Sequence, residues 1–195
     1  MEMICKIMLA MIFLLSKEIP LEQLYEKDYM CKIRKVAESI HYNVIHSDRY
    51  DYNMALTLVA LGYVESRFGI NEEGLIISKR GACGIFQIIP KYTDYSCIEY
   101  FDPVLSTMVA VNIIQQIKDT CKLKNKDECL CHYNSGNKCF KSSKRYATLV
   151  SSFKNQIIEE IFIKPQSFLN ILVIHFFTHD CSILLDRNKI PFSIY

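Results

Sequence analysis

Glu65 has the setting that most favours acid–base chemistry in this sequence. It ends an apolar run in which Met54, Leu58 and Leu61 recur at the spacing of one helical face. Apolar surroundings disfavour a charged carboxylate and raise its pKa, so such a group can protonate a poor leaving group, for example a glycosidic oxygen. On this pattern alone, a solvated carboxylate at a helix end is the commoner interpretation. The residues that follow Glu65 decide between the two.

Three segments carry a stronger signal because they occur in a fixed order. They read Glu65-Ser66-Arg67-Phe68, then Ser78-Lys79-Arg80-Gly81-Ala82-Cys83-Gly84-Ile85-Phe86-Gln87-Ile88-Ile89-Pro90, then Tyr133-Asn134-Ser135-Gly136. These segments resemble the E-S-x-F, S-x-x-G-A-x-G-x-x-Q-I-x-P and A-Y-N-x-G signatures of the soluble lytic transglycosylase catalytic domain, in the goose-type lysozyme-like superfamily. The resemblance covers roughly residues 30 to 160 and leaves out both ends of the chain.

The resemblance implies a set of residues that act on a glycan strand. Glu65 would be the catalytic acid and then the base, and Tyr133 would orient it by hydrogen bonding. Ser78 and Gln87 would contact the sugar at the cleavage subsite, and Asn134 would form part of the facing wall of the cleft.

Further residues would support this site. Tyr146, in the helix after the facing wall, is another candidate for the substrate groove. For Tyr133 and Tyr146 a half-buried position in the core is the alternative. Ser66 and Phe68 would shape the end of the helix that carries Glu65. Gly81 and Gly84 would let the backbone approach the glycan, and Gly136 would complete the facing wall.

The chain departs from the family pattern in three ways. His132 stands where the family has alanine, and the loop between Glu65 and Ser78 is longer than the common form. Four cysteines in or near the motifs are also atypical, and we expect them to staple the walls of the cleft: Cys83, Cys129, Cys131 and Cys139.

The resemblance implies cleavage of the β-1,4 bond between N-acetylmuramic acid and N-acetylglucosamine, without a cofactor. Glu65 would protonate the bridging oxygen and then deprotonate the muramoyl C6 hydroxyl, which gives a 1,6-anhydro product. A goose-type lysozyme would hydrolyse the same bond and would need a second carboxylate; Glu72, Glu73, Asp94 and Glu99 are near in sequence. A non-catalytic wall-binding module, of a phage particle or a secretion apparatus, is the alternative from another class.

The elements that must position these residues are mainly helical. Residues 31–48 place Ile33, Val36, Ile40 and Val44 on one face of a first core helix. Asp102-Pro103 is a helix-start signal, followed by an apolar stripe at Val104, Met108, Val111 and Ile114. Residues 143–162 again have helical periodicity.

Loops separate these helices. Gly69, Asn71 and Gly74 break the helix of Glu65, and a loop-rich or small-sheet region precedes Pro90. Cys129 to Cys139 is predicted to be a compact loop held at its ends. These elements predict a mainly α (α+β) fold class with a minor β element, and the resemblance implies a lysozyme-like single domain.

The chain divides into three parts. Residues 1–20 contain a short apolar run behind a lysine, which predicts a signal peptide or signal anchor with possible membrane association; a buried first helix is the alternative. Residues 30–160 form the catalytic domain. Residues 161–195 are an accessory segment, in which residues 168–177 are expected to form a packing helix. His175 and His179 there share a helical face, but no full ligand set for a metal accompanies them.

Composition excludes some partners. A chain of 195 residues with half of them hydrophobic suits one domain, and the net charge of +2 disfavours a nucleic-acid binder. Of nine cysteines, eight remain beyond Cys5, an even number that favours disulfides and export. Cys129-Leu130-Cys131 lacks the spacing of a zinc site, so no metal is expected. The expected partner is a peptidoglycan glycan strand, and the oligomeric state stays open.

Overall fold

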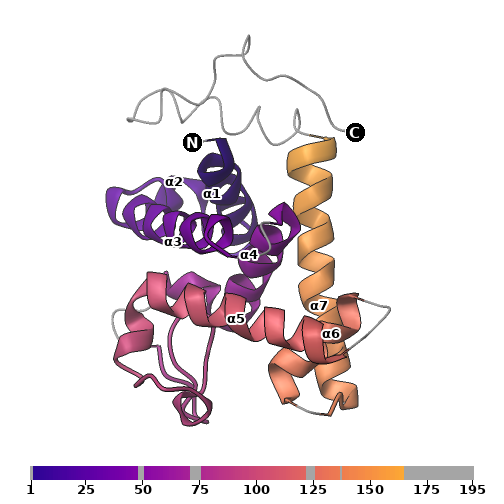
Figure 1. Ribbon diagram of the computed structural model, residues 1–195. Coiled ribbons are helices and arrows are strands. Elements are labelled where there is room, and N and C mark those ends of the chain that lie inside the picture. Colours follow the sequence, from indigo (N-terminus) through magenta and orange to yellow (C-terminus); the bar gives the residue numbers. More distant parts are fainter. Residues whose placement is uncertain (1, 48–50, 71–75, 122–125, 137, 165–195) are drawn as a thin grey trace.

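The computed structural model describes residues 2–47, 51–70, 76–121, 126–136 and 138–164. Within these residues the chain forms seven α-helices and no strand. The helices cluster around α4, with α1 and α3 on one side, α5 crossing below and α7 standing beside it (Figure 1). The predicted mainly α class is confirmed, and it is consistent with a lysozyme-like fold.

Helix α4 (Tyr52–Ser66) is the centre of the core. It begins where the side chain of Asp51 accepts a hydrogen bond from the amide of Asn53 at 2.9 Å. The ten residues from Met54 to Tyr63 are all buried, because α4 contacts α1, α3, α5 and α7. The apolar face predicted before Glu65 thus widens to the whole circumference of the helix.

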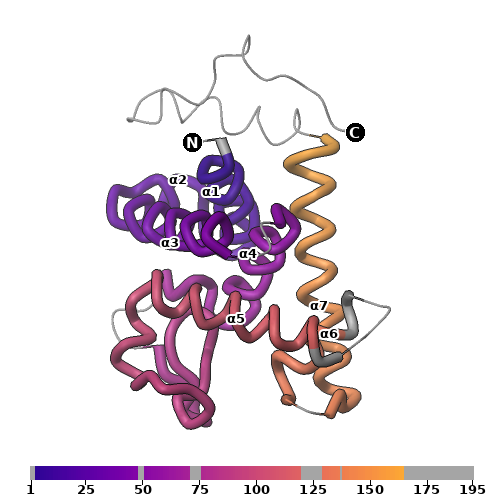
Figure 2. The backbone as a smooth tube through the Cα atoms, viewed as in Figure 1, coloured from indigo at the N-terminus to yellow at the C-terminus, as the bar shows by residue number. Residues whose placement is uncertain are grey.

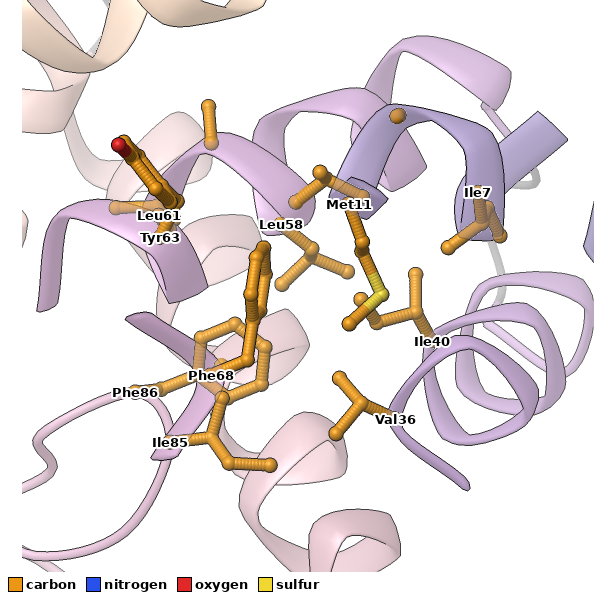
Figure 3. Packing of buried hydrophobic residues seen from close by; sticks show 14 of the residues in the cluster. Ile7, Met11, Val36, Ile40, Leu58, Leu61, Tyr63, Phe68, Ile85 and Phe86 are labelled. Atoms are coloured by element: carbon orange, nitrogen blue, oxygen red, sulfur yellow. The ribbon is translucent and has the colours of Figure 1, made fainter. Parts of the chain in front are cut away.

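Helix α3 (Lys27–Ile45) is the predicted first core helix. Its four predicted core residues are buried: Ile33, Val36, Ile40 and Val44. Figure 3 shows Val36 and Ile40 facing Leu58 of α4 and Met11 of α1 across the core. The helical period of the sequence therefore located this packing face correctly.

The N-terminal apolar run forms α1 (Glu2–Leu15), which packs against α3 and α4. Ile7, Met11 and Leu14 are among its fully buried side chains. This is the arrangement of a buried first helix that the sequence left open, and an export role for residues 1–20 stays a prediction. A short helix α2 (Leu21–Leu24) follows. Among the described helices none combines the length and the apolar character that crossing a bilayer requires.

Helix α5 (Pro103–Cys121) begins as predicted, with the Asp102 carboxylate accepting from the amide of Val104 at 2.9 Å. The predicted apolar stripe is partly wrong, because Val104 is 43% exposed. The buried face instead includes two hydroxyl residues, and Thr107 satisfies its own by donating to the carbonyl of Pro103 at 2.6 Å. The residues on the buried face of α5 are Ser106, Thr107, Val109, Ala110, Val111 and Ile114.

Two helices close the described fold. Helix α7 (Lys141–Ile157), continued by a π-helical turn (Ile158–Ile163), confirms the helix predicted over 143–162. The compact loop predicted from Cys129 is wrong, since most of it belongs to helix α6 (Lys126–Ser135). A disulfide from Cys131 to Cys139 joins α6 to the connection before α7. Figure 2 shows the chain turning from α5 through α6 into α7.

The segment between α4 and α5 has little regular structure. In its described residues, 67–70 and 76–102, the β element is limited to two isolated bridges, Ile77 with Cys83 and Cys83 with Ile88. Short 3-10 turns surround them (Arg67–Gly69, Pro90–Tyr92 and Glu99–Phe101), and a disulfide links Cys83 to Cys97. A disulfide of this kind stabilises the fold mainly by restricting the unfolded chain.

The predicted helix over residues 168–177, together with His175 and His179, lies outside the described residues.

Candidate active site

Glu65 lies in the last turn of α4, at the end of the buried run. Burial raises the pKa of its carboxyl to about 7, although a hydrogen bond from Tyr146 acts in the opposite direction. The upward shift predicted from the sequence is therefore confirmed. Near neutral pH this group populates both its protonated and its ionised form.

Tyr146, on α7, donates its hydroxyl hydrogen bond to Oε1 of Glu65. Burial raises the pKa of Tyr146 far above its usual value, and the neighbouring Glu65 charge adds to this. The phenol therefore keeps its proton across the physiological pH range and remains a donor. Of the two tyrosine candidates in the sequence, Tyr146 is therefore the one that donates to the carboxyl.

Tyr133, on α6, has a different partner from the one predicted. Its hydroxyl donates to the backbone carbonyl of Phe86 at 2.9 Å. A phenol has a single proton to donate, so the hydrogen bond expected from Tyr133 to Glu65 is supplied by Tyr146 instead. Burial raises the pKa of Tyr133, and the Glu65 charge raises it further. Tyr133 is thus an electrostatic neighbour of the carboxyl and ties the loop before Pro90 to α6.

The turn after Glu65 has an unusual backbone. Arg67 and Phe68 have φ values of 54° and 58°, in the left-handed region that non-glycine residues seldom occupy. Ser66 donates its hydroxyl to the carbonyl of Ile85 at 2.8 Å, and the Phe68 ring is buried in the core beside Ile85 (Figure 3). The helix end and the loop are joined at these points.

Gly62 makes room for this turn. A Cβ added at Gly62 would lie 2.9 Å from Cδ1 of Phe68, closer than real Cβ contacts. The ring of Phe68 therefore packs directly on the backbone of α4, one turn before Glu65.

The side chains of Ser78 and Gln87 make hydrogen bonds within their own loop. Ser78 Oγ accepts from the amide of Ala82 at 3.0 Å. Gln87 Nε2 donates to the carbonyl of Gly84 at 3.0 Å. Both side chains are partly exposed, so their predicted contacts with a sugar stay predictions.

The three motif glycines have positive φ values, for two different reasons. At Gly84 (φ +73°) an added Cβ would lie 2.2 Å from the carbonyl oxygen of Tyr100, so the close approach there is to the chain itself. At Gly81 and Gly136 an added Cβ would meet nothing within 4 Å. At these two positions glycine is favoured by the backbone conformation alone, because the left-handed region is unfavourable for residues with a side chain.

The end of α6 carries the remaining motif residues. Asn134 is exposed, and Gly136 follows the helix with its carbonyl 2.6 Å from Nδ1 of His132. His132 also lies close enough to Cys131 and Cys139 for the three to resemble a metal site. The two cysteines are joined in a disulfide, so their sulfurs are not thiolate ligands.

The cysteines predicted to staple the site divide into two groups. Cys83, Cys131 and Cys139 form disulfides, with Cys97 as the partner of Cys83. Cys129 is buried in α6. The disulfides fasten the loop between α4 and α5 and the connection between α6 and α7, which are the segments that bear motif residues.

The candidates for a second carboxylate have other surroundings. Glu99 accepts hydrogen bonds from the amide and the hydroxyl of Ser96, each at 2.7 Å, and these lower its pKa. Asp94 is exposed. Glu72 and Glu73 lie outside the described residues.

One set of contacts near Glu65 escaped the sequence analysis. Glu18, which follows α1, forms an ion pair with Arg67 at 2.7 Å. The two residues are 49 positions apart, and no local pattern pairs charges over such a separation. The E-S-x-F match drew attention to Arg67 only as a variable position.

Comparisons with known proteins agree with this geometry. The family model described as Transglycosylase SLT domain matches residues 44–155, more than half of the chain. The match contains Glu65, Tyr133 and Tyr146 together with the loop between α4 and α5. No curated protein and no solved structure matches the chain. Domains of this family act on peptidoglycan outside the cytoplasm, so the match supports peptidoglycan transglycosylase activity at the level of the family.

Proposed function

Because the chain belongs to the transglycosylase SLT domain family, we propose that it is a peptidoglycan lytic transglycosylase in which Glu65 is the general acid and base. Its substrate is the β-1,4 bond between N-acetylmuramic acid and N-acetylglucosamine. The product is a glycan with a 1,6-anhydro-muramoyl end, and no cofactor takes part.

The reaction has two proton transfers. Glu65 first gives its proton to the bridging oxygen, and the bond from that oxygen to the muramoyl C1 breaks, leaving an oxocarbenium-like centre that the substrate's own N-acetyl group stabilises. The Glu65 carboxylate then takes the proton of the C6 hydroxyl, whose oxygen bonds to C1. The carboxyl ends in its starting state, so one acidic residue serves both steps.

The observation that carries this proposal is the environment of Glu65. Its carboxyl has a pKa of about 7, and its hydrogen-bond partner is a neutral tyrosine rather than a cation. A group whose pKa lies near the working pH transfers protons efficiently in both directions. This supports a role as acid first and base second.

We assign the glycan contacts to Ser78, Gln87 and Asn134, with Tyr133 and Tyr146 beside the reacting bond. Ser78 accepts a backbone hydrogen bond, which leaves its hydroxyl proton for a sugar oxygen. Gln87 donates through Nε2, which leaves its carbonyl oxygen as an acceptor for a sugar hydroxyl. A protein groove that reads sugars needs such fixed donors and acceptors.

Product analysis tests the proposal. Purified peptidoglycan is digested and the released muropeptides are weighed by mass spectrometry, in which anhydro ends are one water lighter than reducing ends. Anhydro ends that vanish in Glu65→Gln support the lyase. Reducing ends alone would favour a goose-type lysozyme, and wall binding without release of fragments would favour a non-catalytic module.

We also propose that the chain works after export. The disulfides Cys83–Cys97 and Cys131–Cys139 suit an oxidising compartment, and the substrate of the family lies outside the cytoplasm. Peptide mapping without reductant, on protein isolated from its native source, tests this. Both pairs found oxidised supports export, and free thiols at these positions would contradict it.

A further inference from the structure

Lys17 and Glu18, the residues just after α1, contact both helices that carry the proposed reacting pair. Glu18 contacts the end of α4, which holds Glu65. Lys17 contacts α7, which holds Tyr146. Both residues lie outside the stretch 44–155 that the family model matches. The segment before the matched domain thus contacts the two helices that carry the proposed reacting pair.

The Glu18 carboxylate is the centre of a three-residue network. It accepts from Nε of Arg67 at 2.7 and 2.9 Å, one distance to each oxygen, and from the hydroxyl of Tyr63 at 2.8 Å. Arg67 also donates through Nη1 to the carbonyl of Tyr63 at 2.7 Å, and its guanidinium carbon lies 4.3 Å from the centroid of the Tyr63 ring. The hydrogen bond from Arg67 lowers the pKa of Glu18, so the pair is charged at neutral pH.

Lys17 makes the matching contacts with α7. Its ammonium donates to the side chain of Gln156 and lies 5.4 Å from the centroid of the Phe153 ring. Phe153 in turn packs edge-on against Tyr63, with ring centroids 4.9 Å apart. The contacts of Lys17 and Glu18 therefore meet where α4 and α7 touch.

The backbone after Glu65 needs such support. Arg67 and Phe68 are successive non-glycine residues with positive φ, a backbone conformation that is unfavourable for residues with a Cβ. Backbone in this region persists only where surrounding contacts hold it. Phe68 is held by burial in the core, whereas Arg67 is held by Glu18 and Tyr63.

We propose that Glu18 is a positioning residue for the reaction: together with Lys17 it holds the end of α4 against α7, and so fixes the Glu65 carboxyl against the Tyr146 hydroxyl. This inference rests on the function proposed above, and it requires that Lys17 and Glu18 stay in the exported chain, as they would in a signal anchor or a buried first helix. Glu18 touches no reacting atom, and its effect passes through the turn at Arg67.

The proposal separates catalysis from stability. The side chains of Arg67 and Glu18 are 38% and 41% exposed, and an exposed ion pair contributes little to the free energy of unfolding. A small displacement of a reacting group, by contrast, lowers the rate strongly. Loss of the pair should therefore affect kcat much more than the melting temperature.

The test compares Glu18→Gln with Glu38→Gln. Glu38 is the matched control, because its carboxylate pairs with Arg34 at 2.7 Å on the exposed face of α3. For Glu18→Gln we expect kcat on purified peptidoglycan to fall about tenfold with KM unchanged, while Glu38→Gln behaves as wild type. In Glu18→Gln the alkaline limb of the rate profile should move to higher pH, because the hydrogen bond from Tyr146 lowers the pKa of Glu65 and would be weakened. Tyr133 is the other titratable group that interacts with the Glu65 charge.

Two companion variants complete the design. Arg67→Gln removes the pair from its other side and should give the same loss as Glu18→Gln, which also covers the case in which Glu18→Gln does not fold. Glu18→Asp keeps the charge and should recover part of kcat. Wild-type kcat and pH profile in both Glu18→Gln and Arg67→Gln would overturn the positioning role.

A double-mutant cycle with Tyr146→Phe identifies the path of the effect. If Glu18 acts by aligning Glu65 with Tyr146, adding Glu18→Gln to Tyr146→Phe lowers kcat no further. An equal loss in both backgrounds would overturn the proposed path. Failure of the proposed function has a different signature: wild type would release no anhydro ends, or Glu65→Gln would retain activity, whatever Glu18→Gln does.

Discussion

The hydroxyl of Tyr146 donates a hydrogen bond to the carboxylate of Glu65 across 81 positions of sequence. The two residues come from α7 and α4, which pack against each other. Burial raises the pKa of the carboxyl while this hydrogen bond lowers it. The value near 7 is the balance of these two effects, and each can be changed by itself.

Removing the hydrogen bond should raise the pKa of Glu65 further. In Tyr146→Phe the carboxylate loses the donor that stabilises its charge, whereas burial still favours the neutral form. The alkaline limb of the kcat/KM profile should then move to higher pH, because the acid stays protonated longer, and kcat should fall because the carboxyl is no longer held. Tyr92→Phe is the control, since Tyr92 is 77% exposed. A limb that stays in place would contradict the assignment of Glu65 as the titrating acid.

The ionised carboxylate of Glu65 should lower the free energy of unfolding at alkaline pH. Burial raises its pKa in the folded state to about 7, above the usual value of 4.5, so the folded state binds the proton more tightly than the unfolded state. Its contribution is therefore complete below pH 4.5 and is lost as the pH rises to 7. The free energy of unfolding of Glu65→Gln should equal that of wild type near pH 4 and exceed it by about 3 kcal/mol near pH 8. Urea unfolding at both pH values measures this difference. The same difference between the two proteins at pH 4 and at pH 8 would refute the prediction.

Gly84 should tolerate no side chain. Gly84→Ala combines a positive φ with a Cβ placed 2.2 Å from the carbonyl oxygen of Tyr100, so the backbone on one side must move. Gly81→Ala is the matched control, with a similar φ but nothing within 4 Å, and should cost only about 1 kcal/mol. Denaturant unfolding should show a loss for Gly84→Ala at least about 2 kcal/mol larger. Equal losses would mean that the approach to Tyr100 is not a constraint.

The disulfide from Cys83 to Cys97 should stabilise the loop between α4 and α5. It closes a loop with a sequence separation of 14, for which the entropy of the unfolded chain predicts about 3 kcal/mol. Thermal unfolding of Cys83→Ser/Cys97→Ser should therefore begin well below that of wild type. Reductant should lower the melting temperature of wild type and leave the melting temperature of a variant lacking both disulfides unchanged. A variant as stable as wild type would show that the loop is ordered by its other contacts.

Helical periodicity located most of the fold. The core residues of α3, the buried run of α4, the start of α5 and the extent of α7 follow from apolar spacing and a capping aspartate. Two errors share one cause. Val104 was assigned to the core and Cys129 to Cys139 to a loop, because the sequence pattern counts only apolar side chains. Ser106 and Thr107 are buried in α5, and the polar composition of α6 hides its helix.

The site was predictable to the extent that its chemistry is local. The desolvation of Glu65 follows from the run that precedes it. The choice between Tyr133 and Tyr146 does not, because it depends on how α6 and α7 pack. The contact of Glu18 with Arg67 depends likewise on the placement of α1, and a short sequence motif contains nothing about it. The substrate contacts of Ser78, Gln87 and Asn134 stay predictions.

The enclosure of α4 has a consequence for the order of events in a turnover. A helix buried over ten successive residues exchanges its amide hydrogens last and moves least among the elements of a small domain. The last turn of α4 therefore holds the Glu65 carboxyl in one place. A stiff glycan strand must then approach this carboxyl and leave it again in each turnover through motion of other parts of the protein or of the strand itself.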